Sequence, residues 1–278
     1  MADAPANRLG IEMLTLMGMG PVDHIRLAGE LGCVSISTGL MKLPLARFGH
    51  GHLDTLYPDW SLADDAALRR ETRTALAESG VHIGLGEGFR VAPGLDVADF
   101  APQLDIFAEL GTRRINAIGL EPDWQRSIDQ LGRLADMVGE RGMRFLIEFA
   151  PPHAIDCAAR ALAVADALGH DRCGMMLDAM HFFRSGGRME DMAGLPVIYA
   201  QMCDAPRIAP AGVSYLDEAM FARMVPGEGE LPLREWLAAL PADCEIGLEV
   251  PQIAALEAGT TPAEHAARVV SAARAMGA

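Results

Sequence analysis

Short apolar runs alternate with longer amphipathic stretches along the whole chain. The apolar runs are expected to form strands over Leu9–Leu14, Val34–Thr38, His82–Leu85, Arg114–Ile118, Arg144–Phe149, Gly174–Leu177, Val197–Met202 and Ile246–Val250. The longer stretches have helical periodicity over Pro21–Leu31, Ala63–Glu78, Val97–Leu110, Trp124–Arg141, Ile155–Leu168, Leu233–Leu240 and Pro262–Met276. Only the crossover around Arg188–Met192 is too short to predict a full helix. Strands that alternate with helices pair in parallel through right-handed crossovers.

Eight such units in 278 residues predict a single (β/α)8 barrel, an α/β fold of typically about 250 residues. The alternative is an open, doubly wound sheet, which usually carries a glycine-rich phosphate loop after its first strand. Here that junction, Thr15–Pro21, reads T-L-M-G-M-G-P and lacks the G-x-G-x-x-G spacing. No linker or low-complexity tract divides the chain, so one barrel domain over residues 1–278 is expected, with its active site at the C-terminal face.

The net charge limits the kinds of molecule that the protein can bind. With 38 acidic and 23 basic residues the net charge is −15, which opposes binding to nucleic acids and to anionic membrane surfaces. No apolar run reaches the roughly 18–20 residues that span a bilayer. The apolar stretch Ile11–Gly20 is interrupted by Glu12 and follows no basic segment, which argues against a signal peptide. The five cysteines are dispersed in apolar segments, as is typical of reduced thiols in a cytoplasmic protein.

Two long insertions follow the C-terminal ends of strands, where barrel enzymes build their active sites. One is Asp204–Pro232. The other is Gly39–Ser61, which we expect to act as a lid that keeps water from a reactive intermediate. Its candidate functional side chains are His50, His52, Tyr57 and Trp60.

A polar residue closes each of the last four predicted strands. These residues are Glu148, Asp178, Gln201 and Glu249. Neighbouring strands lie about 4.8 Å apart, so the four side chains could converge at the barrel mouth. Three carboxylates in a low-dielectric site repel one another unless some are protonated or a cation is present. The pattern therefore predicts a divalent metal bound by these four residues.

The same segments resemble a known family. The pattern comprises I-E-F at Glu148, L-D-A-M-H at Asp178 to His181, A-Q-M-C-D at Gln201 to Asp204, P-G-E-G-E-L-P-L at Pro226 to Leu233, and G-L-E-V-P around Glu249. Their order and spacing are similar to the xylose isomerase-like TIM-barrel superfamily, whose members are often labelled sugar phosphate isomerases/epimerases. The resemblance is clearest from about residue 140 to 252.

The resemblance implies metal ligands from strands five to eight, usually Glu, Asp, His and Glu. Here Gln201 replaces the commoner histidine, as in the branch that contains 3-dehydroshikimate dehydratases. The resulting all-oxygen ligand set favours Mg²⁺ or Mn²⁺, with Co²⁺ or Zn²⁺ as alternatives.

Three further residues are candidates for binding substrate. His181 follows Asp178 by three residues, and the resemblance implies that a histidine here contacts substrate. Arg223 could anchor a substrate oxygen through its fixed fork of donors, or instead form a salt bridge with Glu218 or Glu228. Glu228 lies in the Pro226–Gly229 turn and is expected near the substrate or in solvent. Glu87 and His153 are weaker candidates for the pocket.

These groups suit proton abstraction next to a carbonyl, with Glu148, Glu249 or His181 as the base. Return of the proton gives an isomerase or epimerase of a small polyhydroxylated substrate, and loss of a β-hydroxyl gives a dehydratase. A barrel that only binds a ligand is a third possibility. The eight histidines and the acidic charge argue against the endonuclease IV branch of the superfamily. The resemblance also implies a homo-oligomer, a dimer or tetramer.

Overall fold

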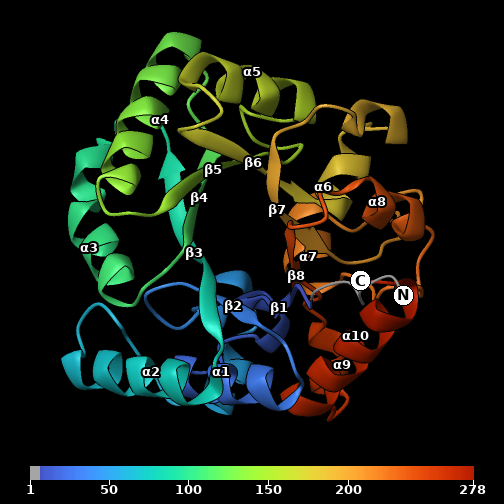
Figure 1. The fold of residues 1–278 in the computed structure, drawn as a ribbon. Coiled ribbons are helices and arrows are strands. Elements are labelled where there is room, and N and C mark those ends of the chain that lie inside the picture. Colours follow the sequence, from blue (N-terminus) through green and yellow to red (C-terminus); the bar gives the residue numbers. More distant parts are fainter. Residues whose placement is uncertain (1–6) are drawn as a thin grey trace, which may run out of the picture.

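Eight parallel strands close into a barrel in the computed structural model, which describes residues 7–278 (Figure 1). The strand order follows the sequence, and β1 pairs with β8 to close the ring. The strands are β1 Leu9–Ile11, β2 Ser35–Thr38, β3 His82–Val91, β4 Arg114–Gly119, β5 Arg144–Glu148, β6 Cys173–Asp178, β7 Val197–Met202 and β8 Glu245–Leu248. The predicted (β/α)8 barrel is confirmed, and the open doubly wound sheet is excluded.

The helices form the outer ring around the strands (Figure 1). They are α1 Pro21–Glu30, α2 Ala66–Ser79, α3 Ala101–Glu109, α4 Trp124–Gly139, α5 Ala158–Leu168, α6 Ala179–Arg184, α7 Tyr215–Phe221, α8 Leu233–Ala239, α9 Ile253–Glu257 and α10 Pro262–Met276. Several begin at side-chain caps that satisfy otherwise free N–H groups. Asp65 accepts from the first turn of α2, and Thr261 forms a reciprocal capping box with Glu264 at the start of α10.

The crossover from β6 to β7 is short, as the sequence indicated. It consists of α6, which starts directly after the strand, and a single 3-10 turn at Met189–Met192. Asp178 is both the last residue of β6 and the N-cap of α6, because its Oδ1 accepts a hydrogen bond from the backbone N–H of His181 at 2.7 Å. This junction fixes a carboxylate and a histidine at the barrel mouth.

Two strand ends differ from the prediction by three residues or more, and the other boundaries agree to within two residues. The first strand ends at Ile11 instead of Leu14, because Met13–Leu16 turns into a 3-10 helix. The third extends to Val91 instead of Leu85, pairing its distal part with β4 through a register shift between Gly86 and Phe89. Both differences change which residues lie at the mouth, since Glu12 moves to the end of a strand and Glu87 moves inside one.

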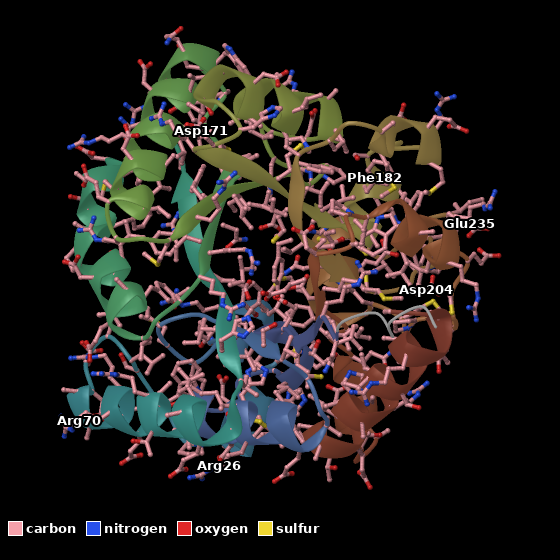
Figure 2. All side chains as sticks on the ribbon, viewed as in Figure 1. Arg26, Arg70, Asp171, Phe182, Asp204 and Glu235 are labelled. Atoms are coloured by element: carbon pink, nitrogen blue, oxygen red, sulfur yellow. The ribbon has the colours of Figure 1, made fainter. Side chains whose placement is uncertain are left out.

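The barrel interior is filled by side chains, with Leu85, Leu146, Met176 and Tyr199 forming one buried cluster. Charged side chains such as Arg26 and Arg70 extend outward from the helices (Figure 2). All five cysteines are free, and four of them are buried. Among the described helices, none combines the length and apolar character needed to cross a bilayer.

Candidate active site

Arg223 is the central cation of the barrel mouth. Its side chain is 2% exposed, and its guanidinium lies between two carboxylates. Nη1 pairs with Oδ2 of Asp178, and Nη2 pairs with Oε2 of Glu249 at 2.8 Å. Nε donates to the backbone oxygen of Ala219 at 2.7 Å. Arg223 therefore cross-links the ends of β6 and β8 to α7.

The two loops that follow β7 and β8 hold Arg223 in place. Its backbone N–H donates to the oxygen of Pro251 at 3.2 Å, and its own oxygen accepts from the side chain of Gln252 at 2.9 Å. The next residue, Met224, forms an antiparallel bridge with Asp204, two residues after the end of β7. The alternative from the sequence, a salt bridge from Arg223 to Glu218 or Glu228, is not formed, because Arg223 pairs with Asp178 and Glu249.

The charges of Asp178, Glu249 and Arg223 shift one another's pKa values. Burial opposes ionisation of Asp178, but the Arg223 guanidinium holds the pKa of this carboxyl below its ordinary value. Burial likewise disfavours the charged guanidinium, yet Asp178 and Glu249 raise the pKa of Arg223 well above its usual range. The pKa of Glu249 is raised, first by burial and then by the neighbouring carboxylates, although Arg223 opposes this shift. Arg223 is thus charged, but its single positive charge cannot neutralise all the carboxylates of the barrel mouth.

Gln201 lies in a network that includes an unpredicted residue, Glu12. The amide Nε2 of Gln201 donates to Oε2 of Glu12 at 3.0 Å and to Oε1 of Glu249 at 3.2 Å. The hydroxyl of Tyr199 donates to Oε1 of Glu12 at 2.5 Å. The carbonyl Oε1 of Gln201 is buried without a hydrogen-bond partner. An unpaired buried acceptor costs free energy, so this oxygen is well suited to a cation.

Glycine at position 247 makes room for Glu12. A Cβ added to Gly247 on β8 would lie 1.6 Å from Oε1 of Glu12 and 2.7 Å from the hydroxyl of Tyr199. No other residue type fits there without displacing the buried carboxylate. The close approach of β8 to Glu12 is therefore built into the strand.

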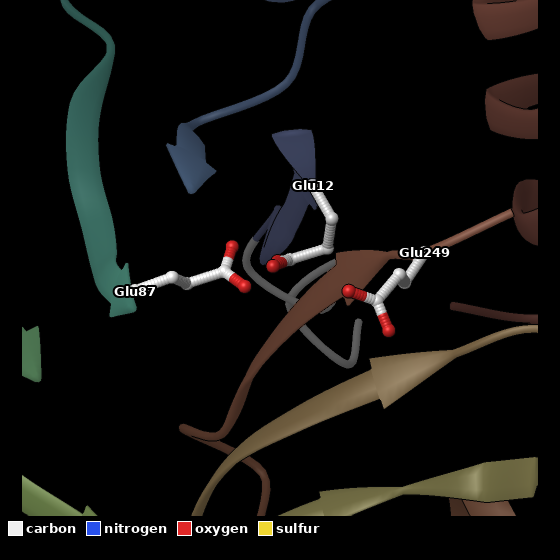
Figure 3. Close-up of side chains that lie close together, drawn as sticks. All are labelled: Glu12, Glu87 and Glu249. Carbon is white, nitrogen blue, oxygen red and sulfur yellow. The ribbon is translucent and has the colours of Figure 1, made fainter. Parts of the chain in front are cut away.

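Glu12, Glu87 and Glu249 point toward one another (Figure 3). A ligand oxygen from each lies within 4.8 Å of the other two, and within residues 7–278 this is the one such group of His, Cys, Asp or Glu side chains. Burial and the charge of Glu12 raise the pKa of Glu87 to about 8. Burial also raises the pKa of Glu12, although hydrogen bonds from Tyr199 and Gln201 oppose the shift. Burial and mutual repulsion thus favour the protonated forms of these carboxyls, and a divalent cation bound beside Glu249 would relieve the repulsion.

His181 and Glu148 form the opposite side of the mouth. Nε2 of His181 lies 3.6 Å from Oε1 of Glu148, and Nδ1 lies 2.5 Å from the hydroxyl of Tyr215. Burial raises the pKa of Tyr215, so its hydroxyl keeps the proton and donates it to Nδ1. In the neutral ring Nε2 then carries the N–H that faces Glu148. Oε2 of Glu148 accepts from Asn116 on β4 at 2.6 Å, which orients the carboxylate.

Most of the candidate residues from the sequence lie together. Glu148, Asp178, Gln201, Glu249, His181 and Arg223 are connected by these contacts, and Glu87 joins them through the acidic group. His153 is half-buried. Burial lowers the pKa of its imidazole, and the nearby charge of Glu148 partly opposes this shift.

Glu228 lies apart from this group. It forms an ion pair with Arg268 on α10, and its side chain is 41% exposed. The turn that carries it is organised instead by Asp204, whose carboxylate accepts the N–H groups of Gly227 and Leu231 at 2.9 and 3.1 Å. The position of Glu228 agrees with the solvent-exposed alternative, and its role in binding substrate stays a prediction.

Sequence reasoning missed Glu12, Tyr199 and Tyr215. Glu12 obeys the rule that identified the other carboxylates, because it directly follows an apolar strand. The predicted strand Leu9–Leu14 runs three residues past Ile11, which puts Glu12 inside a strand instead of just after one. The two tyrosines carry no local signal, since one lies within β7 and the other starts α7 at Tyr215.

A sequence model of the family described as "Xylose isomerase-like TIM barrel" matches residues 44–272. An inosose isomerase of Bacillus subtilis (strain 168) is 25% identical over 156 residues, which cover 52% of this chain. The match spans 55% of that relative, so it covers about half of its length.

Two solved structures have similar folds. The IolI protein with a bound zinc atom has a TM-score of 0.77 and 15% identity, with 97% of both chains covered. The probable 3-DHS dehydratase AsbF of Bacillus anthracis has a TM-score of 0.70 and 13% identity, with 93% of this chain and 97% of AsbF covered. At these identities the likeness concerns the fold.

Proposed function

Because the chain belongs to the xylose isomerase-like TIM barrel family, we propose that it is a divalent-metal-dependent isomerase or epimerase of a small polyhydroxylated carbonyl compound. The observation that carries the proposal is the convergence of buried carboxylates, the unpaired oxygen of Gln201 and a single guanidinium at the barrel mouth. The inosose isomerase relative supports the reaction class.

The proposed metal ligands are Glu148, Asp178, Gln201 and Glu249, one from each of the last four strands. Arg223 takes one oxygen of Asp178 and one of Glu249, which leaves the second oxygen of each with lone pairs to share. The all-oxygen set favours Mg²⁺ or Mn²⁺ over zinc. The bound ion would polarise the substrate carbonyl and stabilise negative charge on its oxygen during proton transfer.

The side chains at the barrel mouth have separate roles in proton transfer and in substrate binding. Glu148 or Glu249 serves as the base that takes the proton next to the carbonyl. The third candidate from the sequence, His181, has no free lone pair for this role, because its Nδ1 accepts a hydrogen bond from Tyr215 and its Nε2 carries the N–H. His181 is held in one tautomer by Tyr215, so its Nε2–H can donate to a substrate oxygen. Arg223 holds the two carboxylates in position. Four of its N–H donor directions are used by Ala219, Asp178, Cys203 and Glu249, which leaves one for a substrate oxygen.

Gln201 favours a second candidate, a dehydratase of the 3-dehydroshikimate type. The early proton abstraction is common to both reactions, and a β-hydroxyl leaves in place of proton return. The similar fold of AsbF agrees with this reading. A barrel that binds a ligand without catalysis is the remaining alternative.

A substrate screen tests the proposal. Purified protein with Mn²⁺ is incubated with ketohexoses and, separately, with 3-dehydroshikimate, and products are followed by NMR for isomerisation and for loss of water. Isomerised or epimerised product that disappears in Asp178→Ala and persists in Glu228→Gln supports the isomerase. Water loss from 3-dehydroshikimate supports the dehydratase, whereas stoichiometric ligand binding without turnover or metal supports the non-catalytic barrel.

A further inference from the structure

A cavity of about 490 Å³ lies beside the acidic group. Its wall is formed by β3, the first part of the Gly39–Ser61 loop, the 3-10 turn after β1, α3 and Met220 of α7. Glu87 belongs both to this wall and to the carboxylate group with Glu12 and Glu249. The cavity is thus continuous with the reaction site through Glu87, and its volume is within the usual range for small-molecule sites, roughly 300–1,000 Å³.

The cavity has a mainly apolar wall. Phe89 packs against Phe100 and Phe107 at ring-centroid distances of 5.1 and 5.7 Å, which makes a rigid aromatic surface. The other notable members of the wall are Met13, Met41 and Met220. Methionine side chains adapt their shape and make favourable contacts with aromatic rings. A flat apolar group in the cavity would contact aromatic and methionine side chains of this wall.

The polar groups of the wall are few, and half of them are already bonded. Lys42 donates from Nζ to the backbone oxygens of Asp54 and Tyr57 and to the carboxylate of Asp59, and its side chain is 8% exposed. When its amide is oriented to satisfy both atoms, Gln103 donates to the backbone oxygens of Asp99 and Phe100, in the 3-10 turn that precedes α3. Glu87 at the base and the exposed Arg90 at the rim remain.

A fully hydroxylated ring would leave several hydroxyl groups without partners against such a wall, which costs free energy. An aryl or alkyl group would instead bury apolar surface there. We propose that the substrate is a glycoside-like compound, whose polyhydroxylated carbonyl ring reacts at the carboxylates and whose apolar substituent occupies this cavity. This inference rests on the proposed function for its reactive end and on the cavity wall for its apolar end.

Binding of unreactive glycosides tests the apolar end alone. Isothermal titration calorimetry compares phenyl β-D-glucoside with methyl β-D-glucoside, neither of which carries a carbonyl for the reaction. We expect the phenyl compound to bind about tenfold more tightly or better, because its ring buries apolar surface. Equal affinities of the two glycosides would overturn the proposal.

Two wall variants locate the effect. Met220→Gln and Met41→Gln keep side-chain length but add a polar group, and Met41 is 58% exposed, so the latter has little effect on folding. Each should lower the phenyl-to-methyl affinity ratio at least about threefold, an effect expected when one apolar contact is replaced. Met189→Gln, a half-buried methionine on the 3-10 turn at Met189–Met192, is the matched control and should leave the ratio unchanged. A ratio that survives both wall variants overturns the assignment of this cavity.

The result separates the two proposals. Mn²⁺ binding is measured on the same preparation without glycoside. A phenyl preference in a protein that binds no metal supports the apolar subsite and contradicts the metal-dependent function. Metal binding and ketose turnover with no phenyl preference supports the function and overturns the subsite.

Discussion

Arg223 shows how one residue can control the stability of a buried site. It is the cation that touches both Asp178 and Glu249, and all three side chains are at most 4% exposed. Removing one partner of a buried ion pair leaves an uncompensated charge, which typically costs about 3–5 kcal/mol. Arg223→Met should therefore lower the free energy of unfolding by roughly that amount, as measured by urea denaturation.

Mn²⁺ should recover part of this loss, because a cation that binds the folded state takes over the neutralisation of the carboxylates. Arg268→Met is the matched control: it breaks the exposed pair with Glu228 and is expected to cost at most about 1 kcal/mol, with no recovery by Mn²⁺. A stability of Arg223→Met that equals that of the control would contradict the central role of this guanidinium.

Gln201 and Glu12 give a second prediction at this scale. Glu12 accepts a hydrogen bond from Nε2 of Gln201. The amide oxygen of Gln201 is therefore the atom left without a partner. Glu12→Gln removes the charge that selects this orientation, and loss of such a supporting group typically weakens metal binding about 10–100-fold. Gln201→Leu removes the donor itself and should weaken Mn²⁺ at least as much, while Gln201→His should shift preference toward zinc, cobalt or nickel.

Calorimetric metal titrations of these variants, with far-UV circular dichroism to verify folding, measure the effect. Glu257→Gln, an exposed carboxylate paired with His52, is the control and should bind metal as wild type does. Wild-type affinity in Gln201→Leu would remove Gln201 from the ligand set.

At the scale of elements, the Gly39–Ser61 loop is anchored more firmly than a freely moving lid. Leu45 and Leu53 pack with Phe221 and Ile253 in a satellite core, and Trp60 donates to the backbone oxygen of Gly18 at 3.0 Å. The loop therefore belongs to the wall of the mouth, and the lid remains a prediction.

Lys42 holds the middle of this loop, so Lys42→Met should loosen it. We expect faster limited proteolysis within residues 43–60, lower turnover on the true substrate, and Mn²⁺ affinity within about twofold of wild type, because no proposed ligand lies on the loop. Arg141, whose guanidinium pairs with Asp105 on α3 away from the loop, provides the control Arg141→Met. Unchanged turnover together with faster proteolysis would show that the loop does not serve catalysis.

The sequence patterns of the strands and helices also explain which parts of the molecule are predictable from the sequence. The eight strands were found because each is a short apolar run between periodic helices, and Val197–Met202 was placed to the residue. Polar residues at the ends of β5 to β8 were found by the same local rule. Glu12 was missed because a 3-10 turn of apolar residues looks like a continued strand, and the inward aim of Arg223 depends on contacts between the β7 and β8 loops that no local pattern encodes.

The two ends of the barrel have opposite arrangements of charge. The C-terminal mouth contains several carboxylates around one arginine, whereas at the other end one carboxylate, Glu245, is surrounded by basic side chains. Its oxygens lie 3.1 Å from Arg113 and from Arg114, and 3.0 Å from Nε2 of His82. Glu245 starts β8 and its partners lie on or beside β3 and β4, so the cluster ties distant parts of the barrel together across its base. In barrels of this class the N-terminal face typically serves stability.

This cluster predicts how the stability of the barrel depends on pH. Burial opposes ionisation of Glu245, but His82 and Arg114 bring its pKa down to about 2, compared with an ordinary value of 4.5. Because the pKa is lower in the folded state, the stabilisation is complete above about pH 4.5 and is lost as the pH falls toward 2. At pH 7 Glu245→Gln should be less stable than wild type by about 2 kcal/mol, a value reduced for solvent screening of the half-exposed Arg113.

The measurement is urea denaturation of wild type and Glu245→Gln at several pH values between 2 and 7. The difference between the two proteins should shrink steadily from pH 4.5 to pH 2, since protonated Glu245 and glutamine are both neutral. Glu264→Gln, at the exposed capping box of α10, serves as the comparison and should show a much smaller difference at pH 7. A Glu245→Gln difference that stays constant down to pH 2 would mean that packing around position 245, and not its charge, holds the base of the barrel together.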